Sequence, residues 1–404
     1  MFGHLLLLCS IVGLLSCTVF LILLAAGFVR FGRRPRPEAY AGPWPSVSLL
    51  KPLHGSEPGL EANLESFFLQ DYPAYEIIFG CRQESDPALD VVRAVRRHHP
   101  QVPVKIVFSG EPEHPNAKVC SLQKMAEAAG SDYLVISDSD VRVTPEYVRE
   151  VTRPLLDNEV GMVTCLYRGV PSGGLWSRLE ALGMSVEMTA GVVVADMLEG
   201  LKFALGPTMA IRRDTLEEMG GFQVLADYCA DDFVLGQRVF EAGKQVVLSH
   251  YVVDHVALHQ RCMASLQHQV RWMKSTRFSR PKGHIGTGLT FAMPFGLLGL
   301  VAGVVMGDPL LGLALFLYAA LNRMMEAMLA GWGVVRDPLA LRYFWLYPVR
   351  DLLGFLLWCA SFISTSIVWR GERYRLQMGG KMIRQATPEE SAASSETVAV
   401  DELA

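Results

Sequence analysis

The stretch that decides the fold is YLVISDSDVRV, residues 133–143. Its first half is an apolar run that is short enough for a buried strand. The run ends in two carboxylates spaced one residue apart, Asp138 and Asp140. Two like charges this close repel, and each resists ionisation unless a cation lies nearby. The stretch therefore predicts a buried strand whose carboxyl end meets a cation.

Three similar apolar runs precede this strand and alternate with helical patterns. The runs are SVSLL (46–50), EIIFGC (76–81) and VKIVF (104–108), and the helix candidates are 59–70, 87–99 and 117–129. This alternation predicts an α/β fold with a parallel sheet that helices cover on both faces. Ligands bind such sheets beyond the carboxyl ends of the strands, so we expect Asp138 and Asp140 to lie at a ligand-binding edge with residues 52–55 and 82–86.

Two interpretations of the acidic pair stay open on spacing alone. A divalent cation held by hard oxygens, Mg²⁺ or Mn²⁺, would relieve the repulsion and share its other positions with phosphate, which favours a nucleotide diphosphate as ligand. Alternatively, Asp138 and Asp140 lie in a solvated turn before a helix that begins near Pro145.

The composition indicates a mixed soluble and membrane architecture. Of the 404 residues, 50% are hydrophobic and 19% are charged, and the mean hydropathy is +0.25. Residues 5–29 carry no charge and are long enough to cross a hydrocarbon core of roughly 30 Å. Four arginines follow at once and predict a cytoplasmic location for the next segment, namely Arg30, Arg33, Arg34 and Arg36.

Three apolar runs return near the C-terminus, at residues 286–306, 309–335 and 352–369. Basic residues predict a cytoplasmic location both between the last two runs and after the third. Three full crossings are incompatible with both predictions, so either one run is re-entrant or interfacial, or the charge rule misleads at this end. We expect an anchor at 1–36, a cytoplasmic domain at 37–285, a membrane region at 286–385 and a disordered tail at 386–404.

Other classes of partner receive little support. The net charge of −4 gives no indication of nucleic acid. The eight cysteines are scattered without CxxC or His/Cys spacing, so they predict neither zinc nor a disulfide framework. The sequence does not determine the oligomeric state.

Six motifs occur in order over residues 45–285: KPLHGSEPGLEANLESFFLQDYP, DPALDVV, HPNAKV, ISDSDVRV, CADDFVLG and VRWMK. Together they resemble the ceramide glucosyltransferase family, which includes bacterial lipid glycosyltransferases such as those of hopanoid biosynthesis. The resemblance implies a GT-A fold, flanking membrane helices and an inverting transfer of a sugar from a UDP-sugar to a lipid hydroxyl.

The resemblance also implies the donor site. Asp86 would lie near the uracil and ribose, and Lys118 near the nucleotide. Asp138 matches the second family aspartate, and Asp140 completes a DxD where relatives often have glycine. These two carboxylates would hold Mg²⁺ or Mn²⁺.

The last two motifs imply the catalytic and acceptor residues. Asp232 matches the presumed general base, and Asp231 stands where relatives often carry glutamate. The closing motif reads HQVRW, with His268 at its variable first place. We expect Arg271 to face phosphate oxygens, Trp272 to stack on the sugar or wall the pocket, and Asp231 and His268 to lie on the acceptor side.

Each of these residues has a plainer interpretation. Arg271 and Trp272 are also typical of an interfacial anchor, Asp231 and Asp232 of a helix N-terminus, and Lys118 of a solvated helix. The stretch 179–205, rich in methionine, would be core or a lipid-facing surface.

The functions that the sequence leaves open differ in class. The preferred one is a glycosyltransferase at the cytoplasmic face of a membrane, expected to be a bacterial inner membrane, that moves glucose or N-acetylglucosamine to ceramide or a hopanoid polyol. A processive polysaccharide synthase would normally need more spans. A glycoside hydrolase needs paired carboxylates but no metal–diphosphate seat. A non-catalytic membrane protein would be favoured by loss of Asp232 or the DxD, and neither is lost.

Overall fold

The computed structural model describes residues 1–35, 40–258 and 261–385, and the tail predicted to be disordered lies outside them. The predicted alternation of strands and helices is confirmed over residues 47–136. Parallel strands β1, β2, β3 and β4 alternate with helices α2, α3 and α4. Their bounds are β1 (Val47–Pro52), α2 (Leu60–Phe68), β2 (Tyr75–Cys81), α3 (Ala88–His98), β3 (Val104–Phe108), α4 (Ala117–Ala128) and β4 (Tyr133–Ile136).

The complete sheet is mixed, with eight strands in the order β3-β2-β1-β4-β7-β6-β8-β5. Strand β7 (Met209–Arg212) runs antiparallel to both β4 and β6 (Val160–Pro171), and β6 runs parallel to β8 (Gln245–Ala257). The prediction of a parallel sheet thus holds for β1 to β4 and for the pair β6 and β8, whereas β7 and β5 run antiparallel to their neighbours. The two-residue strand β5 (Val141–Arg142) pairs with the end of β8, so that Val141 faces His255. This pairing connects the stretch after the acidic pair to the far side of the sheet.

The remaining elements flank this sheet or lie in the membrane region. They are α1 (Phe2–Gly32), α5 (Tyr147–Thr152), η1 (Arg153–Leu156), α6 (Gly174–Gly183), η2 (Met184–Met188), α7 (Thr189–Glu199), α8 (Arg213–Glu218), η3 (Phe222–Leu225), α9 (Asp231–Glu241), α10 (Cys262–Ser279), α11 (Pro281–Thr287), α12 (Met293–Met306), α13 (Pro309–Glu326), η4 (Ala327–Val334), α14 (Pro338–Tyr343), η5 (Phe344–Leu346), α15 (Tyr347–Ala360), β9 (Ser366–Trp369), β10 (Glu372–Leu376) and β11 (Met382–Arg384).

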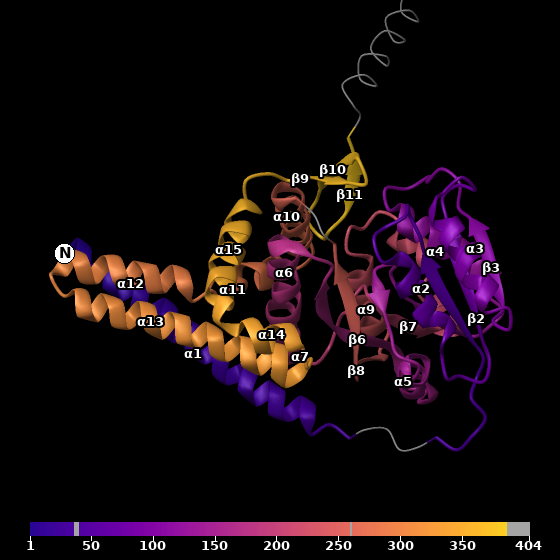
Figure 1. Ribbon diagram of the computed structural model, residues 1–404, viewed down its shortest axis with the longest axis horizontal. Coiled ribbons are helices and arrows are strands. Elements are labelled where there is room, and N and C mark those ends of the chain that lie inside the picture. Colours follow the sequence, from indigo (N-terminus) through magenta and orange to yellow (C-terminus); the bar gives the residue numbers. More distant parts are fainter. Residues whose placement is uncertain (36–39, 259–260, 386–404) are drawn as a thin grey trace, which may run out of the picture.

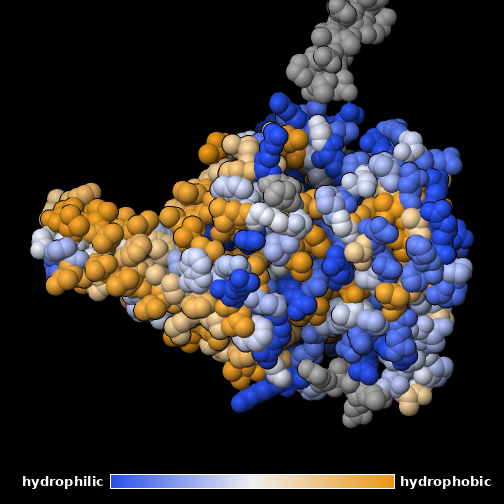
Figure 2. Space-filling model, in the orientation of Figure 1, coloured by the Kyte–Doolittle hydropathy of each residue, from blue (hydrophilic) through white to orange (hydrophobic). Residues whose placement is uncertain are grey.

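Helices α1, α12 and α13 form an arm that projects from the sheet domain (Figure 1). The arm is apolar on its surface, whereas the sheet domain is largely hydrophilic (Figure 2). Helix α1, the stretch Gly174–Glu199 and the stretch Pro309–Val334 are each long and apolar enough to cross a membrane. Exposing the apolar side chains of the arm to water would cost free energy, so the protein associates with a membrane through the arm.

The course of the arm bears on the basic residues that follow the runs 309–335 and 352–369, which both indicate the same side of a membrane. Helix α12 turns at Gly307 into α13, and the start of α1 lies beside this turn, since a Cβ on Gly3 would lie 2.7 Å from the Cγ of Met306. Helices α12 and α13 thus form a hairpin that returns to the end of the arm from which it started (Figure 1). The apolar run at 352–369 is not one helix, because α15 ends at Ala360 and the chain continues into strand β9, which agrees with the alternative that one of the three runs does not cross fully.

One long helical segment joins the arm to the sheet. It consists of α6, the π-helical turn η2 and α7. Its most apolar 18-residue stretch is 67% buried. On one side Gly169 of β6 approaches the backbone of Ala181, and on the other side Gly27 of α1 approaches Val193. The stretch 179–205 is therefore mainly core, and it fixes the sheet against the arm.

A buried network of charges lies where the arm meets this segment. Arg323 of α13 pairs with Glu326 and with Asp351 of α15, the latter at 3.3 Å. Arg350 of α15 pairs with Glu187 of η2 at 2.8 Å. Because breaking one partner of a buried pair leaves an uncompensated charge, these pairs strongly disfavour separation of the three helices.

Close backbone contact within the hairpin gives a first prediction. A Cβ on Gly303 would lie 2.6 Å from the Asp308 carbonyl oxygen and from the backbone of Gly312. We expect Gly303→Ala to destabilise the protein by about 1–3 kcal/mol, as overpacking does, and to lower the thermal unfolding midpoint in detergent. Gly191→Ala is the matched control, since its Cβ would meet nothing within 4 Å. An unchanged midpoint in Gly303→Ala would contradict the packing described for α12 and α13.

Candidate active site

The acidic pair at the end of β4 is met by three cationic side chains from different elements. Lys118 of α4 pairs with Asp138 at 2.7 Å. Lys51, at the end of β1, donates to the backbone carbonyl of Asp138 and to the Ser137 hydroxyl. The Nε2 atom of His255 lies 2.9 Å from the Asp140 carboxylate. The cations expected beside this strand are therefore supplied in part by the protein itself.

Burial and these neighbours shift the pKa values in opposite directions. Burial lowers the pKa of Lys51 to about 7. Burial also disfavours the charged form of Lys118, but Asp138 and Asp231 outweigh it and raise the pKa of that lysine. Burial likewise disfavours the charged form of His255, but the neighbouring carboxylate of Asp140 outweighs this effect and raises the pKa of His255. Lys118 is thus the cation that is fixed in its charged form at this edge.

Two further carboxylates, Asp231 and Asp232, begin helix α9 and face the same edge. Lys118 lies 3.6 Å from Asp231. Asp232 accepts hydrogen bonds from the backbone N–H groups of Gly206, at 2.7 Å, and Phe233, at 2.8 Å. Burial first, and Asp231 second, raise the pKa of Asp232 to about 6. A carboxylate with such a pKa is suited to accept a proton near neutral pH.

Gly206 lies between the two acidic groups. A Cβ on this glycine would lie 3.1 Å from Oδ2 of Asp232 and 3.7 Å from Oδ2 of Asp138. The absence of a side chain here leaves the space between the two carboxylates open to a ligand.

The residues present fit a divalent cation, although they do not form a complete cage. Within residues 1–35, 40–258 and 261–385, no three His, Cys, Asp or Glu side chains are grouped to hold a metal ion. However, Oδ1 of Asp140 is buried without a hydrogen-bond partner in the described structure. Mg²⁺ commonly takes only one or two carboxylates from the protein and the rest from phosphate and water, which Asp138 and Asp140 can satisfy.

Asp86 lies at the same sheet edge but is already engaged. Its carboxylate accepts hydrogen bonds from the backbone N–H groups of Gly55, at 3.0 Å, and Ala88, at 2.9 Å. It therefore shapes the loop after β1. That loop carries Glu57, which the sequence analysis missed, and burial and the carboxylate of Asp140 raise the pKa of Glu57 to about 7.

The HQVRW motif on α10 divides between two surroundings. The Nδ1 atom of His268 lies 2.9 Å from Oε1 of the buried Glu180, within hydrogen-bond distance. The ring centroid of Trp272 lies 4.3 Å from that of His268 and 6.4 Å from that of His255. This half borders the acidic pair. Arg271 instead lies over the ring of Trp369, at 5.7 Å, in the C-terminal sheet.

A narrow pocket opens beyond the ends of β1 and β2. It is lined by residues from two distant parts of the sequence, 52–121 and 369–374. Its lining includes His54, Arg82 and Lys118 from the first half, and Trp369 and Arg370 from the turn between β9 and β10. Sequence reasoning placed Trp369 at the end of an apolar run and Arg370 only among the basic residues that follow it. The signals that could have found the missed residues are a lysine inside an apolar strand, at Lys51, and the sequence WRGE that follows β9.

The pattern of this site agrees with a family match. The model for glycosyl transferase family 21 matches residues 5–382. The chain belongs to this family. Ceramide glucosyltransferase 1 of Caenorhabditis elegans is 24% identical over 343 residues, which cover 84% of this chain and 73% of the relative. A ceramide glucosyltransferase of Komagataella phaffii is 36% identical over 145 residues, 33% of this chain and 28% of the relative. The family 21 chain described here is therefore a glycosyltransferase, and the predicted resemblance is confirmed.

Solved structures support the fold. A mannosyltransferase from Pyrobaculum calidifontis in complex with GDP-Man and Mn²⁺ superposes with a TM-score of 0.51 at 18% identity, over 87% of this chain and 99% of the other. The predicted GT-A fold with an N-terminal apolar helix is confirmed.

The open space at Gly206 gives a second prediction. Gly206→Ala would place a methyl group between Asp138 and Asp232 and should lower turnover on the order of 10²-fold, as small displacements of reacting groups do. Because Gly206 is buried and the added Cβ would lie 3.1 Å from Oδ2 of Asp232, the thermal midpoint would be measured as well, to separate a loss of folding from a loss of turnover. Sugar transfer would be compared with that of Gly191→Ala, which should match the wild type. Full activity in Gly206→Ala would show that no ligand uses this space.

Proposed function

We propose that this family 21 enzyme transfers a sugar from a UDP-sugar to a hydroxyl group of a membrane lipid, with inversion at the anomeric carbon. The observation that carries the proposal is the convergence of Asp138, Asp140 and Asp232 with Lys118 at one sheet edge, in a chain that also carries an apolar arm. The names of the relatives favour glucose as the sugar and ceramide as the acceptor; N-acetylglucosamine and a hopanoid polyol are the alternatives.

The donor would bind with its diphosphate at the acidic pair and Lys118. A divalent cation held by Asp138 and Asp140 would supply positive charge to the departing diphosphate. Lys118 remains charged beside Asp138 and would stabilise the same developing charge. Asp86 would keep the loop after β1 in place next to the nucleotide.

Asp232 would act as general base toward the acceptor hydroxyl. It is held by two backbone N–H groups, so its position is fixed, and its raised pKa allows it to take up a proton in the reaction. Inversion requires the acceptor oxygen and the leaving UDP to lie on opposite faces of the sugar. Trp272 and His268, on the side of α10, would then wall the acceptor site, with Glu180 orienting His268.

Sugar transfer itself is the third prediction. Purified protein in lipid nanodiscs should release UDP from UDP-glucose when ceramide is present, and mass spectrometry should show ceramide that has gained one hexose. Addition of EDTA should stop the release, and Mn²⁺ or Mg²⁺ should restore it.

Asp232→Asn should lower the rate of this transfer about 10²–10⁴-fold, the usual contribution of a general base, while UDP binding persists. Transfer of an N-acetylhexosamine, or transfer to a hopanoid polyol, would change the substrate assignment only. Failure to release UDP with any lipid extract would refute the proposed function.

The pKa of Asp232 gives a fourth prediction. Because the base must be ionised, activity should be high above pH 6 and fall as pH drops through about 6. Asp231 raises the pKa of Asp232, so Asp231→Asn should move this acid limb to lower pH. Glu241→Gln, on the exposed end of the same helix α9, is the control and should leave the limb in place. A limb that does not move in Asp231→Asn would exclude Asp232 as the titrating base.

A further inference from the structure

The C-terminal sheet is fastened to the catalytic region although it follows the membrane helices in the chain. Its three strands lie in the order β11-β10-β9. The N–H of Met382 donates to the Asp227 carbonyl at 2.7 Å, and the N–H of Cys229 donates to the Gly380 carbonyl at 3.0 Å. Apolar side chains of this sheet pack with Cys229 and with Phe278 of α10. The position of the β9–β10 turn is therefore fixed relative to helix α9 and its carboxylates.

This turn has an unusual residue for its geometry. Strands β9 and β10 pair so that Trp369 faces Glu372, which leaves Arg370 and Gly371 as the two turn residues. Both have positive φ, 52° and 85°, as a type I′ turn requires. The first position of such a turn is favourable for asparagine, aspartate or glycine and costs energy with an arginine. A strained residue of this kind points to a functional role for its side chain.

The side chain of Arg370 lies in the pocket at the ends of β1 and β2. It lines the pocket together with His54, Arg82 and Lys118. Arg370 is an exposed residue, its guanidinium lies over the ring of Trp369 at 5.9 Å, and within the described residues it makes no hydrogen bond or ion pair. Partial desolvation lowers the pKa of Arg370, whereas the carboxylate of Asp138 acts in the opposite direction. A guanidinium whose N–H donors are unpaired in the described structure thus lies at the same site as the acidic pair.

We propose that Arg370 binds the diphosphate of the nucleotide-sugar donor and that the β9–β10 turn completes the donor site. The inference deepens the proposed function and rests on it. A guanidinium presents a planar fork of N–H donors that matches phosphate oxygens, and it stays charged throughout. Since Lys118 lines the same pocket, the diphosphate would then contact two cations.

The geometry assigns a different role to Arg271, which the sequence motif suggested for phosphate. Arg271 and Arg370 lie over the ring of Trp369, at 5.7 Å and 5.9 Å. Arg271 therefore supports the turn through Trp369 and is a positioning residue, whereas Arg370 extends into the pocket.

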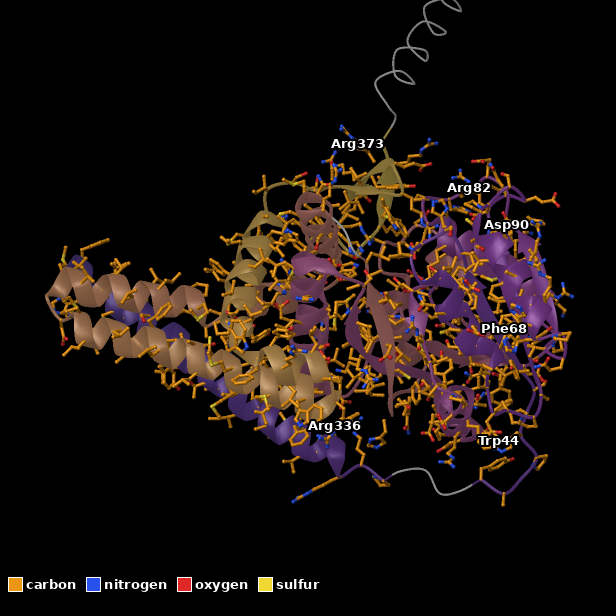
Figure 3. The ribbon with its side chains drawn as sticks, viewed as in Figure 1. Trp44, Phe68, Arg82, Asp90, Arg336 and Arg373 are labelled. Atoms are coloured by element: carbon orange, nitrogen blue, oxygen red, sulfur yellow. The ribbon has the colours of Figure 1, made fainter. Side chains whose placement is uncertain are left out.

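Arg370→Asn is the decisive variant because it separates stability from binding. It creates the Asn-Gly pair that type I′ turns favour, so it should raise the thermal midpoint while removing the guanidinium. Arg370→Lys keeps a positive charge without the fork. Arg373→Met is the control, because Arg373 is exposed on the same sheet (Figure 3) and is not among the residues that line the pocket. Affinities for UDP and UMP would be measured by calorimetry on the full-length protein in nanodiscs with Mn²⁺.

The expected result is a loss of UDP affinity of tenfold or more in Arg370→Asn, a smaller loss in Arg370→Lys and none in Arg373→Met. Affinity for UMP should change less than affinity for UDP, because the second phosphate is the group in question. Wild-type UDP affinity in Arg370→Asn, or equal losses of affinity for UDP and UMP, would overturn this inference. Neither result would contradict the proposed function of sugar transfer. Absence of UDP binding in the wild type would refute the proposed function as well.

Discussion

The cost of placing several carboxylates at one sheet edge is the constraint on which the rest of the structure depends. Asp138, Asp140 and Asp232 are kept close by backbone geometry, and water cannot screen them fully there. The strand order of the sheet reduces this repulsion by bringing basic side chains to the carboxylates. Strand β1 lies next to β4 and brings Lys51 beneath the pair, while β5 draws β8 across and sets His255 against Asp140. The unusual strand order is thus the arrangement that delivers cations from distant segments to one point.

Local sequence patterns predicted the first half of the fold because its strands are apolar and its neighbours in sequence are neighbours in space. Pairing of β5 with β8 joins segments more than a hundred residues apart, and no local period carries that information. Hydropathy left the nature of the run at residues 352–369 open for a related reason. It measures apolar content and cannot distinguish a helix that ends at Ala360 from the strand that follows.

Most of the candidate site could be predicted, since aspartates at strand ends and helix starts leave a mark in the sequence. Glu57 and Lys51 left weaker marks: one is an acid in a glycine-rich loop, the other a lysine inside an apolar run. Their importance comes from burial and from the field of their neighbours, which only the folded chain creates. Arg271 shows the opposite case, because its motif is plain in the sequence but its contact with the ring of Trp369 is created only by the fold.

The division of the chain at residue 285 has to be considered in this light. The division remains a prediction, yet the sheet formed by β9, β10 and β11 packs on α10 and adds to the pocket from beyond the membrane helices. A fragment that ended at residue 285 would retain Asp138 and Asp232 but lose the pocket wall that carries Arg370. Because α15 and the buried pairs of Arg350 and Arg323 connect that wall to the arm, the pocket and the apolar arm are held in a fixed position relative to each other by the same helices.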